Sequence, residues 1–129
     1  PEVGIGIDVT HATDDPGNEN KKEIPCKLGA GPCISKGPNI NPEVEKLLVA
    51  SAKKHKIPYQ AAASSKPLGN DTNAMQVNRR GVATACIGLP NRYMHTQVEV
   101  CSYKDLENAA KLLAAFIKGI GVKTDFTPR

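Results

Sequence analysis

The stretch VGIGIDV, residues 3–9, is the one that decides the fold, because it is a short apolar run that ends in polar residues. β-Branched residues with interleaved glycines are typical of a buried strand that other elements approach closely. A similar apolar run, VATACIGL, occupies residues 82–89. Helical patterns lie between these two runs and after the second. Strands that alternate with helices predict an α/β fold, in which a layered mixed sheet is flanked by helices.

Two helices carry clear signals at their ends. Asn41 is the expected N-cap of the first, with Pro42 at the first helical position and Pro58 as its stop. The second begins after Ser102, which is expected to form a capping-box-like pair with Asp105, and it ends near Gly119 and Gly121. Its expected apolar stripe comprises Leu106, Ala109, Ala110, Leu113, Phe116, Ile117 and Ile120.

Weaker signals complete the expected elements. Further strands are expected at residues 27–35, 59–65 and 97–101, and the first of these should be irregular or at a sheet edge because it contains two glycines and a proline. Asp71 is expected to cap a short helix that continues to about Arg80. The polar residues 11–22 predict a surface loop. We assign residues 1–121 to one domain and residues 122–129 to a tail.

Composition argues against several classes of protein. The net charge of +4, from 17 basic and 13 acidic residues, is mild, and no basic residues interleave with aromatic ones, so no nucleic-acid partner is expected. No run of apolar residues is long enough for a membrane span. The four cysteines lack C-x-x-C spacing, which favours thiols packed as small hydrophobes over a zinc knuckle. These features predict a cytoplasmic protein without a membrane partner.

A few polar residues stand where chemistry is possible. Asp8 lies near the end of the first apolar strand, where open α/β sheets bind ligands. It could bind a metal ion or orient a substrate, or it could be solvated or hydrogen-bonded to the following turn. His95 lies between two apolar strands and could be a metal ligand, a general base or a hydrogen-bonded loop residue. Asp71 could cap its helix and also face a cleft with the free N–H groups of that helix. His55 closes a helix stripe, so we expect a structural role for it.

Four blocks of sequence, taken in order, resemble one family. They are IDVTHATD at residues 7–14, KLGAGP at 27–32, GNDTNAMQ at 69–76 and RYMHT at 92–96. The closing helix, KDLENAAKLL at 104–113, shares the likeness. Together they resemble the tetrahedral (TET) or glutamyl aminopeptidases, a group that includes proteins once labelled cellulase M. The resemblance implies that residues 1–121 are the C-terminal part of a phosphorylase/hydrolase-like aminopeptidase catalytic domain.

The resemblance also implies a site with two divalent metal ions, zinc or cobalt, held by five side chains. Asp8 and His95 match two of these ligands, which serve different ions of the pair. The remaining ligands (a His, a bridging Asp and a Glu) and the general-base Glu have no match in this sequence. We expect His11 and Asp71 to lie near the substrate. The chain by itself is therefore expected to be inactive as a peptidase.

The implied partners are peptide substrates, the missing N-terminal half of the catalytic domain and further copies of the chain in a large homo-oligomer, often of twelve subunits. Two alternatives remain open from the residues: a non-catalytic assembly or interaction module that keeps the fold without a complete metal site, and a small basic domain for anionic partners. The aminopeptidase interpretation predicts that the carboxylate of Asp8 and the imidazole of His95 lie at the same rim of one sheet.

Overall fold

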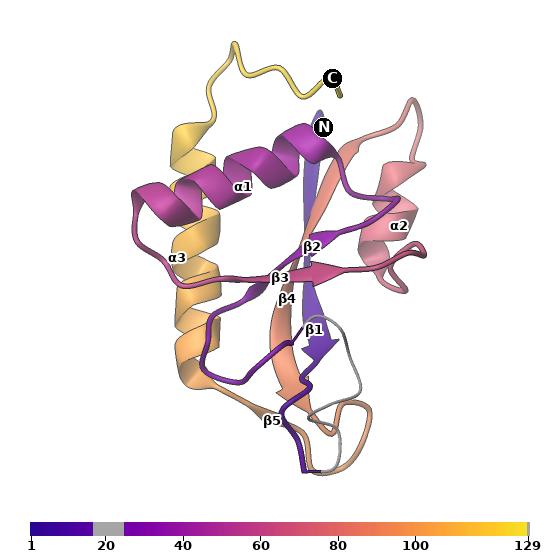
Figure 1. The fold of residues 1–129 in the computed structure, drawn as a ribbon. Helices are drawn as coiled ribbons and strands as arrows, with labels where there is room; N and C mark the ends of the chain where they lie inside the picture. Colours follow the sequence, from indigo (N-terminus) through magenta and orange to yellow (C-terminus); the bar gives the residue numbers. More distant parts are fainter. Residues whose placement is uncertain (17–24, 129) are drawn as a thin grey trace.

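A mixed sheet forms the centre of the computed structural model, which describes residues 1–16 and 25–128 (Figure 1). Within these residues the sheet has five strands, in the spatial order β1-β4-β2-β3, with β5 paired to β4. β1 and β4 run parallel, as do β2 and β3, whereas β4 is antiparallel to both β2 and β5. The strands are β1 (Val3–His11), β2 (Cys33–Lys36), β3 (Gln60–Ala63), β4 (Ala83–Arg92) and β5 (Val100–Cys101). The expected α/β fold with a layered mixed sheet is confirmed.

Helices cover both faces of the sheet. α1 (Pro42–Lys54) and α3 (Tyr103–Gly119) pack against each other on one face, and the short α2 (Asp71–Gln76) lies against β1 and β4 on the other (Figure 1). No helix among the described residues is long and apolar enough to cross a membrane. Residues 17–22, half of the expected surface loop at 11–22, lie outside the described residues, and His11 itself is the last residue of β1.

The apolar core lies between the sheet and the pair α1 and α3. Ala85 and Ile87 of β4 are fully buried there, on the face opposite to α2. The helices contribute side chains at spacings of three and four residues, as expected for amphipathic helices. These are Val44, Leu48 and Ala52 of α1 and Ala109, Leu112 and Phe116 of α3. The core therefore fixes the position of β4, from which the rest of the sheet extends.

The expected stripe of α3 needs a correction. Leu106 and Ile117 are 52% and 56% exposed, whereas Leu112, which the stripe omitted, is fully buried. The buried line follows Asp105, Ala109, Leu112 and Phe116. An apolar face of α3 broader than the core contact explains the error, because periodicity alone does not decide which of two adjacent stripes meets the sheet.

Helix caps were predicted with mixed success. The Oδ1 atom of Asn41 accepts hydrogen bonds from the backbone N–H groups of Glu43 and Val44, which confirms the cap of α1. The cap of α2 is Asn70, whose side chain accepts from the N–H of Thr72, and the helix ends at Gln76 instead of Arg80. Asp71 is already helical, so its predicted capping role is wrong.

The capping box predicted for α3 is also wrong. Ser102 is the N-cap, but its side chain makes no capping hydrogen bond. The carboxylate of Asp105 instead accepts the backbone N–H groups of Gly29 and Gly31, each at 2.8 Å. The Asp105 carboxylate, expected to accept a hydrogen bond at the start of its own helix, therefore binds a loop that is distant in sequence.

The strands predicted at 59–65 and 97–101 were too long, and the one predicted at 27–35 was misplaced; β3 covers only Gln60–Ala63. The glycines of the 27–35 segment fall in and just after a turn before β2, so the segment is irregular, which was one of the two expectations. β2 lies inside the sheet between β3 and β4, so the other expectation, an edge position, is wrong. Of the predicted 97–101 strand only Val100 and Cys101 pair. In the segment assigned as a tail, the backbone O of Phe126 accepts a hydrogen bond from Asn41, and residue 129 lies outside the described residues.

Candidate functional site

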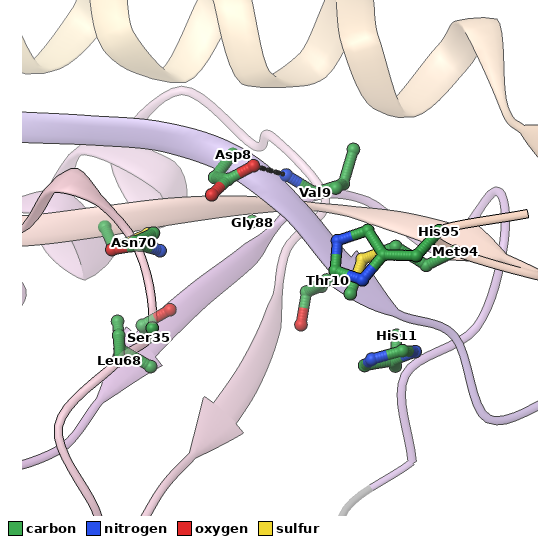
Figure 2. Close-up of a pocket in the computed structure, with 12 residues that line it drawn as sticks. Asp8, Val9, Thr10, His11, Ser35, Leu68, Asn70, Gly88, Met94 and His95 are labelled. Atoms are coloured by element: carbon green, nitrogen blue, oxygen red, sulfur yellow. Dashed lines mark hydrogen bonds between the residues drawn. The ribbon is translucent and has the colours of Figure 1, made fainter.

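A cavity of about 240 Å³ opens at the carboxyl-terminal half of β1, on the face of the sheet that α2 covers (Figure 2). Five parts of the chain line it: residues 8–11 of β1, Ser35 of β2, the 68–70 segment before α2, Cys86 and Gly88 of β4, and the 94–95 turn. Because β1 and β4 are parallel and Asp8 pairs with Gly88, residues that follow both strands reach the same rim of the sheet. This is where α/β sheets place ligands.

Two glycines of β1 allow α2 to lie close to this rim. Gly4 and Gly6 share a face of the strand with Asp8, because side chains alternate along a strand. A Cβ atom at Gly6 would lie 2.1 Å from the Oγ1 atom of the fully buried Thr72, and one at Gly4 would lie 3.3 Å from the sulfur of Met75. The glycines therefore seat α2 against β1, and the Asn70 cap of that helix borders the cavity.

Asp8 presents its carboxylate at the mouth of the cavity. The side chain is exposed, and its Oδ1 atom accepts the backbone N–H of Val9 at 2.7 Å (Figure 2). Its Oδ2 atom has no hydrogen-bond partner among the described residues. A carboxylate can accept further bonds on both oxygens, so Asp8 remains available to a cation or a substrate group.

His95 lies in the turn that follows β4. Its φ of 66° and that of 57° at Tyr93 are left-handed values, and hydrogen bonds hold this conformation. The backbone N–H of His95 donates to the Glu99 carboxylate, and the Thr96 hydroxyl donates to the backbone O of Tyr93. The imidazole is exposed and borders the cavity, so the local hydrogen bonds fix its backbone and leave the ring without a side-chain hydrogen bond within the described chain.

The structure brings three of the four predicted site residues together. Asp8, His11 and His95 all line the cavity, and the rings of the two histidines meet edge to face with centroids 6.3 Å apart. Asp71 is exposed and does not line it, whereas its neighbour Asn70 does. Within residues 1–16 and 25–128, no three His, Cys, Asp or Glu side chains are close enough to hold one metal ion, so Asp8 and His95 each offer a single donor.

Asn70 and Cys86 are among the cavity residues that sequence reasoning missed. Asn70 accepts from the N–H of Thr72 and directs its Nδ2 to the sulfur of Cys86 at 3.4 Å. Cys86 is 2% exposed and lies in β4. The position of Asn70 directly before Asp71 in the GNDT block was the available signal, since Asn and Asp are equally good N-caps.

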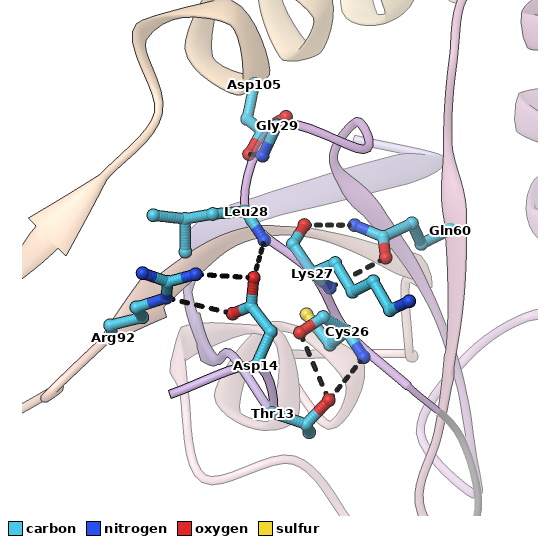
Figure 3. Close-up of polar contacts among 9 residues, drawn as sticks. All are labelled: Thr13, Asp14, Cys26, Lys27, Leu28, Gly29, Gln60, Arg92 and Asp105. Atoms are coloured by element: carbon cyan, nitrogen blue, oxygen red, sulfur yellow. Dashed lines mark hydrogen bonds and ion pairs between the residues drawn. The ribbon is translucent and has the colours of Figure 1, made fainter. Parts of the chain in front are cut away.

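An ion pair ties the exits of β1 and β4 together beside the His95 turn (Figure 3). The Nε and Nη2 atoms of Arg92 donate to the two oxygens of Asp14 at 3.0 and 2.8 Å, and the N–H of Leu28 donates to the second oxygen at 3.2 Å. The hydrogen bonds from Arg92 are the largest cause that lowers the pKa of Asp14. Arg92 precedes His95 by three residues, so this pair anchors the base of the turn that carries the imidazole.

The loop before β2 is held by a second set of polar contacts (Figure 3). The amide of Gln60 donates to the backbone O atoms of Lys27 and Gly31, and its oxygen accepts from the N–H of Lys27 at 2.8 Å. Asp105 holds the same loop from the other side through Gly29 and Gly31. These contacts connect α3, β3 and the loop, and they have a structural role.

With the geometry in place, comparison with known proteins gives a clear result. Residues 1–112 match the family model described as M42 glutamyl aminopeptidase. The chain belongs to this M42 family. It is 46% identical over 128 residues to the lysyl aminopeptidase of Pyrococcus furiosus, a match that covers 99% of this chain and 36% of that protein. The family resemblance read from the sequence blocks is confirmed.

Solved structures agree with this M42 assignment. An aminopeptidase from the archaeon Desulfurococcus kamchatkensis superposes with a TM-score of 0.83 at 38% identity, over 93% of this chain and 35% of that one. A TET aminopeptidase from a marine sediment archaeon of the Thaumarchaeota superposes with a TM-score of 0.86 at 29% identity, over 98% of this chain and 36% of that one. The M42 chain thus spans about a third of the length of the relatives it matches.

Proposed function

We propose that this chain is the carboxyl-terminal part of a two-metal aminopeptidase that removes N-terminal residues from peptides. The observation that carries the proposal is the convergence of Asp8 and His95 on one cavity at the rim of the sheet, in a chain of the M42 family. Most of the catalytic domain would come from sequence outside these residues, so the activity belongs to the longer protein.

The two side chains fit the metals that the resemblance implies. Asp8 offers an anionic oxygen and His95 a neutral nitrogen, which together suit zinc or cobalt, and both are exposed at the cavity. We propose that each binds one ion of the pair. When bound, two such ions would polarise the scissile carbonyl and generate hydroxide near neutral pH.

The other residues of the cavity would position the substrate. His11 lies edge to face with His95 and borders the same space, so we propose that it contacts the peptide beside the metal ligands. Asp71 would reach only a substrate that extends past Asn70 toward the start of α2. The Asp14–Arg92 pair would keep the His95 turn in register with the end of β1.

We further propose that the chain has no peptidase activity by itself. The family's remaining ligands and its general-base Glu have no counterpart in the sequence blocks, and two protein donors are fewer than the three that a catalytic zinc site needs. Hydrolysis of an aminoacyl-anilide by the purified chain, with zinc or cobalt added, tests this. We expect none, and sustained metal-dependent hydrolysis would contradict the proposal.

A chimaera tests the aminopeptidase function directly. The segment of the Pyrococcus furiosus lysyl aminopeptidase that matches this chain is replaced by the 128 residues of this chain that align with it. We expect the chimaera to hydrolyse aminoacyl-anilides and its Asp8→Asn and His95→Gln variants to lose at least about a hundredfold in kcat/KM. His55→Gln is the matched control, because His55 is exposed at the end of α1 and away from the cavity. A folded chimaera without activity, or variants that retain it, would contradict the function.

Two further proposals concern assembly and location. We propose a homo-oligomer, supported by the likeness to a TET aminopeptidase and by the exposed apolar residues Tyr103, Leu106 and Ile117 on α3. We also propose a cytoplasmic location. Light scattering of the chimaera and of a Leu106→Glu, Ile117→Glu variant tests the assembly. The variant should dissociate, and an unchanged mass would exclude this face as the contact.

A further inference from the structure

Two cysteines outside the cavity form a close pair. The sulfur atoms of Cys26 and Cys33 lie 3.1 Å apart, and no disulfide joins them. Both side chains are buried, with 5% of Cys26 and none of Cys33 exposed. A disulfide bond is about 2.05 Å long, so an approach of about 1 Å would suffice to form one.

The fold holds both cysteine backbones in place. Thr13 forms three hydrogen bonds with Cys26: its N–H and its hydroxyl donate to the backbone O, and its hydroxyl oxygen accepts the N–H of Cys26. Cys33 begins β2 and pairs with Gly88 of β4. The residues between them are fastened by Asp105 and Gln60 (Figure 3). The proximity of the two sulfurs is therefore a consequence of the surrounding hydrogen bonds on both sides.

We propose that Cys26 and Cys33 form a reversible intramolecular disulfide when the chain meets a disulfide oxidant such as glutathione disulfide. The thiolate of Cys26 attacks one sulfur of the oxidant and releases one glutathione thiolate. Cys33 then loses its proton to solvent and attacks the Cys26 sulfur, which breaks the mixed disulfide and releases the second glutathione. The two electrons that the protein loses reduce glutathione disulfide to two thiols.

The surroundings set the order of these steps. Cys33 has no exposed surface, and its hydrogen bond with Cys26, its burial and the nearby charge of Asp105 raise its pKa, so it is a poor first nucleophile. Cys26 is the more accessible of the two. Once it carries glutathione it has no thiol proton to share, which removes the largest cause of the raised pKa of Cys33. With 5% of Cys26 exposed, the first step requires a local opening of the loop and should be slow.

The crosslink would fasten the segment that follows β1 to the first residue of β2. Closing this short loop constrains the unfolded chain, so the oxidised form should melt at a temperature higher by on the order of 5 °C. Reduction would reverse the change. The pair would thus make the stability of the sheet beside the cavity depend on the thiol–disulfide balance around the protein.

The test uses the full chain, incubated with glutathione disulfide at pH 8, alkylated and analysed by mass spectrometry. We expect the mass before alkylation to fall by two hydrogen atoms, alkylated thiols to fall from four to two, and one peptide to contain Cys26 joined to Cys33. Dithiothreitol should restore all four. Cys101→Ser should leave the crosslink intact, because Cys101 is exposed and in β5, whereas Cys33→Ser should abolish it.

Burial could slow the native reaction, so a parallel sample is unfolded and refolded in the glutathione buffer before the same measurement. An unchanged mass in both samples would overturn the proposal. So would a stable glutathione adduct on Cys26 that never resolves, a crosslink to Cys86 or Cys101, or an oxidised chain that melts no higher than the reduced one.

Discussion

Replacing Asp105 by Asn should cost this chain much of its stability. The carboxylate is 1% exposed at the start of α3 and accepts the N–H groups of Gly29 and Gly31, each at 2.8 Å. An amide of the same shape has one oxygen and one NH₂ group, so only one N–H could keep its acceptor. The other would face a donor, in a loop that packs against the helix.

The magnitude follows from the hydrogen bonds lost. A hydrogen bond to a charged group contributes about 1.5–3 kcal/mol, and a buried donor without an acceptor costs about 1–3 kcal/mol. We therefore expect Asp105→Asn to lower the free energy of unfolding by roughly 2–4 kcal/mol, which is a large part of the 5–15 kcal/mol typical of a domain. Asp105→Ala should cost at least as much, because both N–H groups lose their acceptor.

Urea unfolding monitored by circular dichroism measures this, with Glu107→Gln as the matched control. Glu107 is exposed on the same helix, so its loss should change the free energy by less than about 0.5 kcal/mol. The loop should also respond, and amide exchange at Gly29 and Gly31 should accelerate in Asp105→Asn. If that variant unfolds within about 0.5 kcal/mol of the parent, the two contacts do not hold the loop, and the reasoning is refuted.

Three further predictions concern other parts of the fold. Gly6→Ala should destabilise the chain by about 1–3 kcal/mol because its Cβ would meet the Thr72 hydroxyl. Adding Thr72→Ala should recover most of that loss, because it removes this buried hydroxyl, which lacks a hydrogen-bond partner in the described chain. Additive effects of the two substitutions in urea unfolding would contradict the contact. Asp14 has a lowered pKa in the folded chain, so its pairing with Arg92 stabilises the fold above the unfolded pKa of about 3.9 and is lost as the pH falls through the folded value. The free energy of unfolding, measured at pH 6, 4 and 3, should therefore fall less with decreasing pH in Asp14→Asn than in the parent. Parallel pH profiles of the two proteins would refute this role of the ion pair. Asn41→Ala should cost about 1–2 kcal/mol and Asn41→Asp clearly less, because Asp keeps the cap of α1; equal losses in thermal unfolding would show that the cap is not the cause.

Sequence signals predicted the elements well where adjacent residues determine the backbone conformation. Asn41 followed by Pro42 defines a helix start through the backbone alone, and the structure places the cap there. The VGIGIDV run forms β1, and its glycine face lies close to α2, as the interleaved glycines indicated. The strand lies at the edge of the sheet and none of its residues is fully buried, so the expected burial is wrong. The confirmed part of the fold is therefore the part in which nearest neighbours along the chain decide the conformation.

The errors in predicting caps and strand positions arise where contacts with residues distant in sequence determine the structure. Asn70 and Asp71 are equally good caps, and the choice depends on the backbone angle at which the chain enters α2, which adjacent residues do not fix. Asp105 was assigned to its own helix, but the 29–31 turn, far away in sequence, supplies two N–H groups that the carboxylate satisfies. The interior position of β2 likewise depends on its pairing with β4.

The candidate site shows the same division. Asp8 and His95 could be named from blocks of sequence that resemble a family, but their shared rim results from the parallel pairing of β1 with β4. Cys86 could not be found in this way, because a cysteine in an apolar strand has the same pattern whether it faces the core or a cavity. Asp8 and His95 were therefore accessible from sequence as candidate ligands, a role that stays a prediction, whereas most of the cavity lining was not accessible.

Metal content of the chimaera tests the central claim most directly, that Asp8 and His95 each bind one ion of a pair. The chimaera, its Asp8→Asn and His95→Gln variants and the His55→Gln control are loaded with zinc, dialysed and analysed by elemental mass spectrometry. We expect two zinc ions per chain in the chimaera and the control, and a loss of about one ion or more in each ligand variant. Two tightly held ions in both ligand variants would contradict the account.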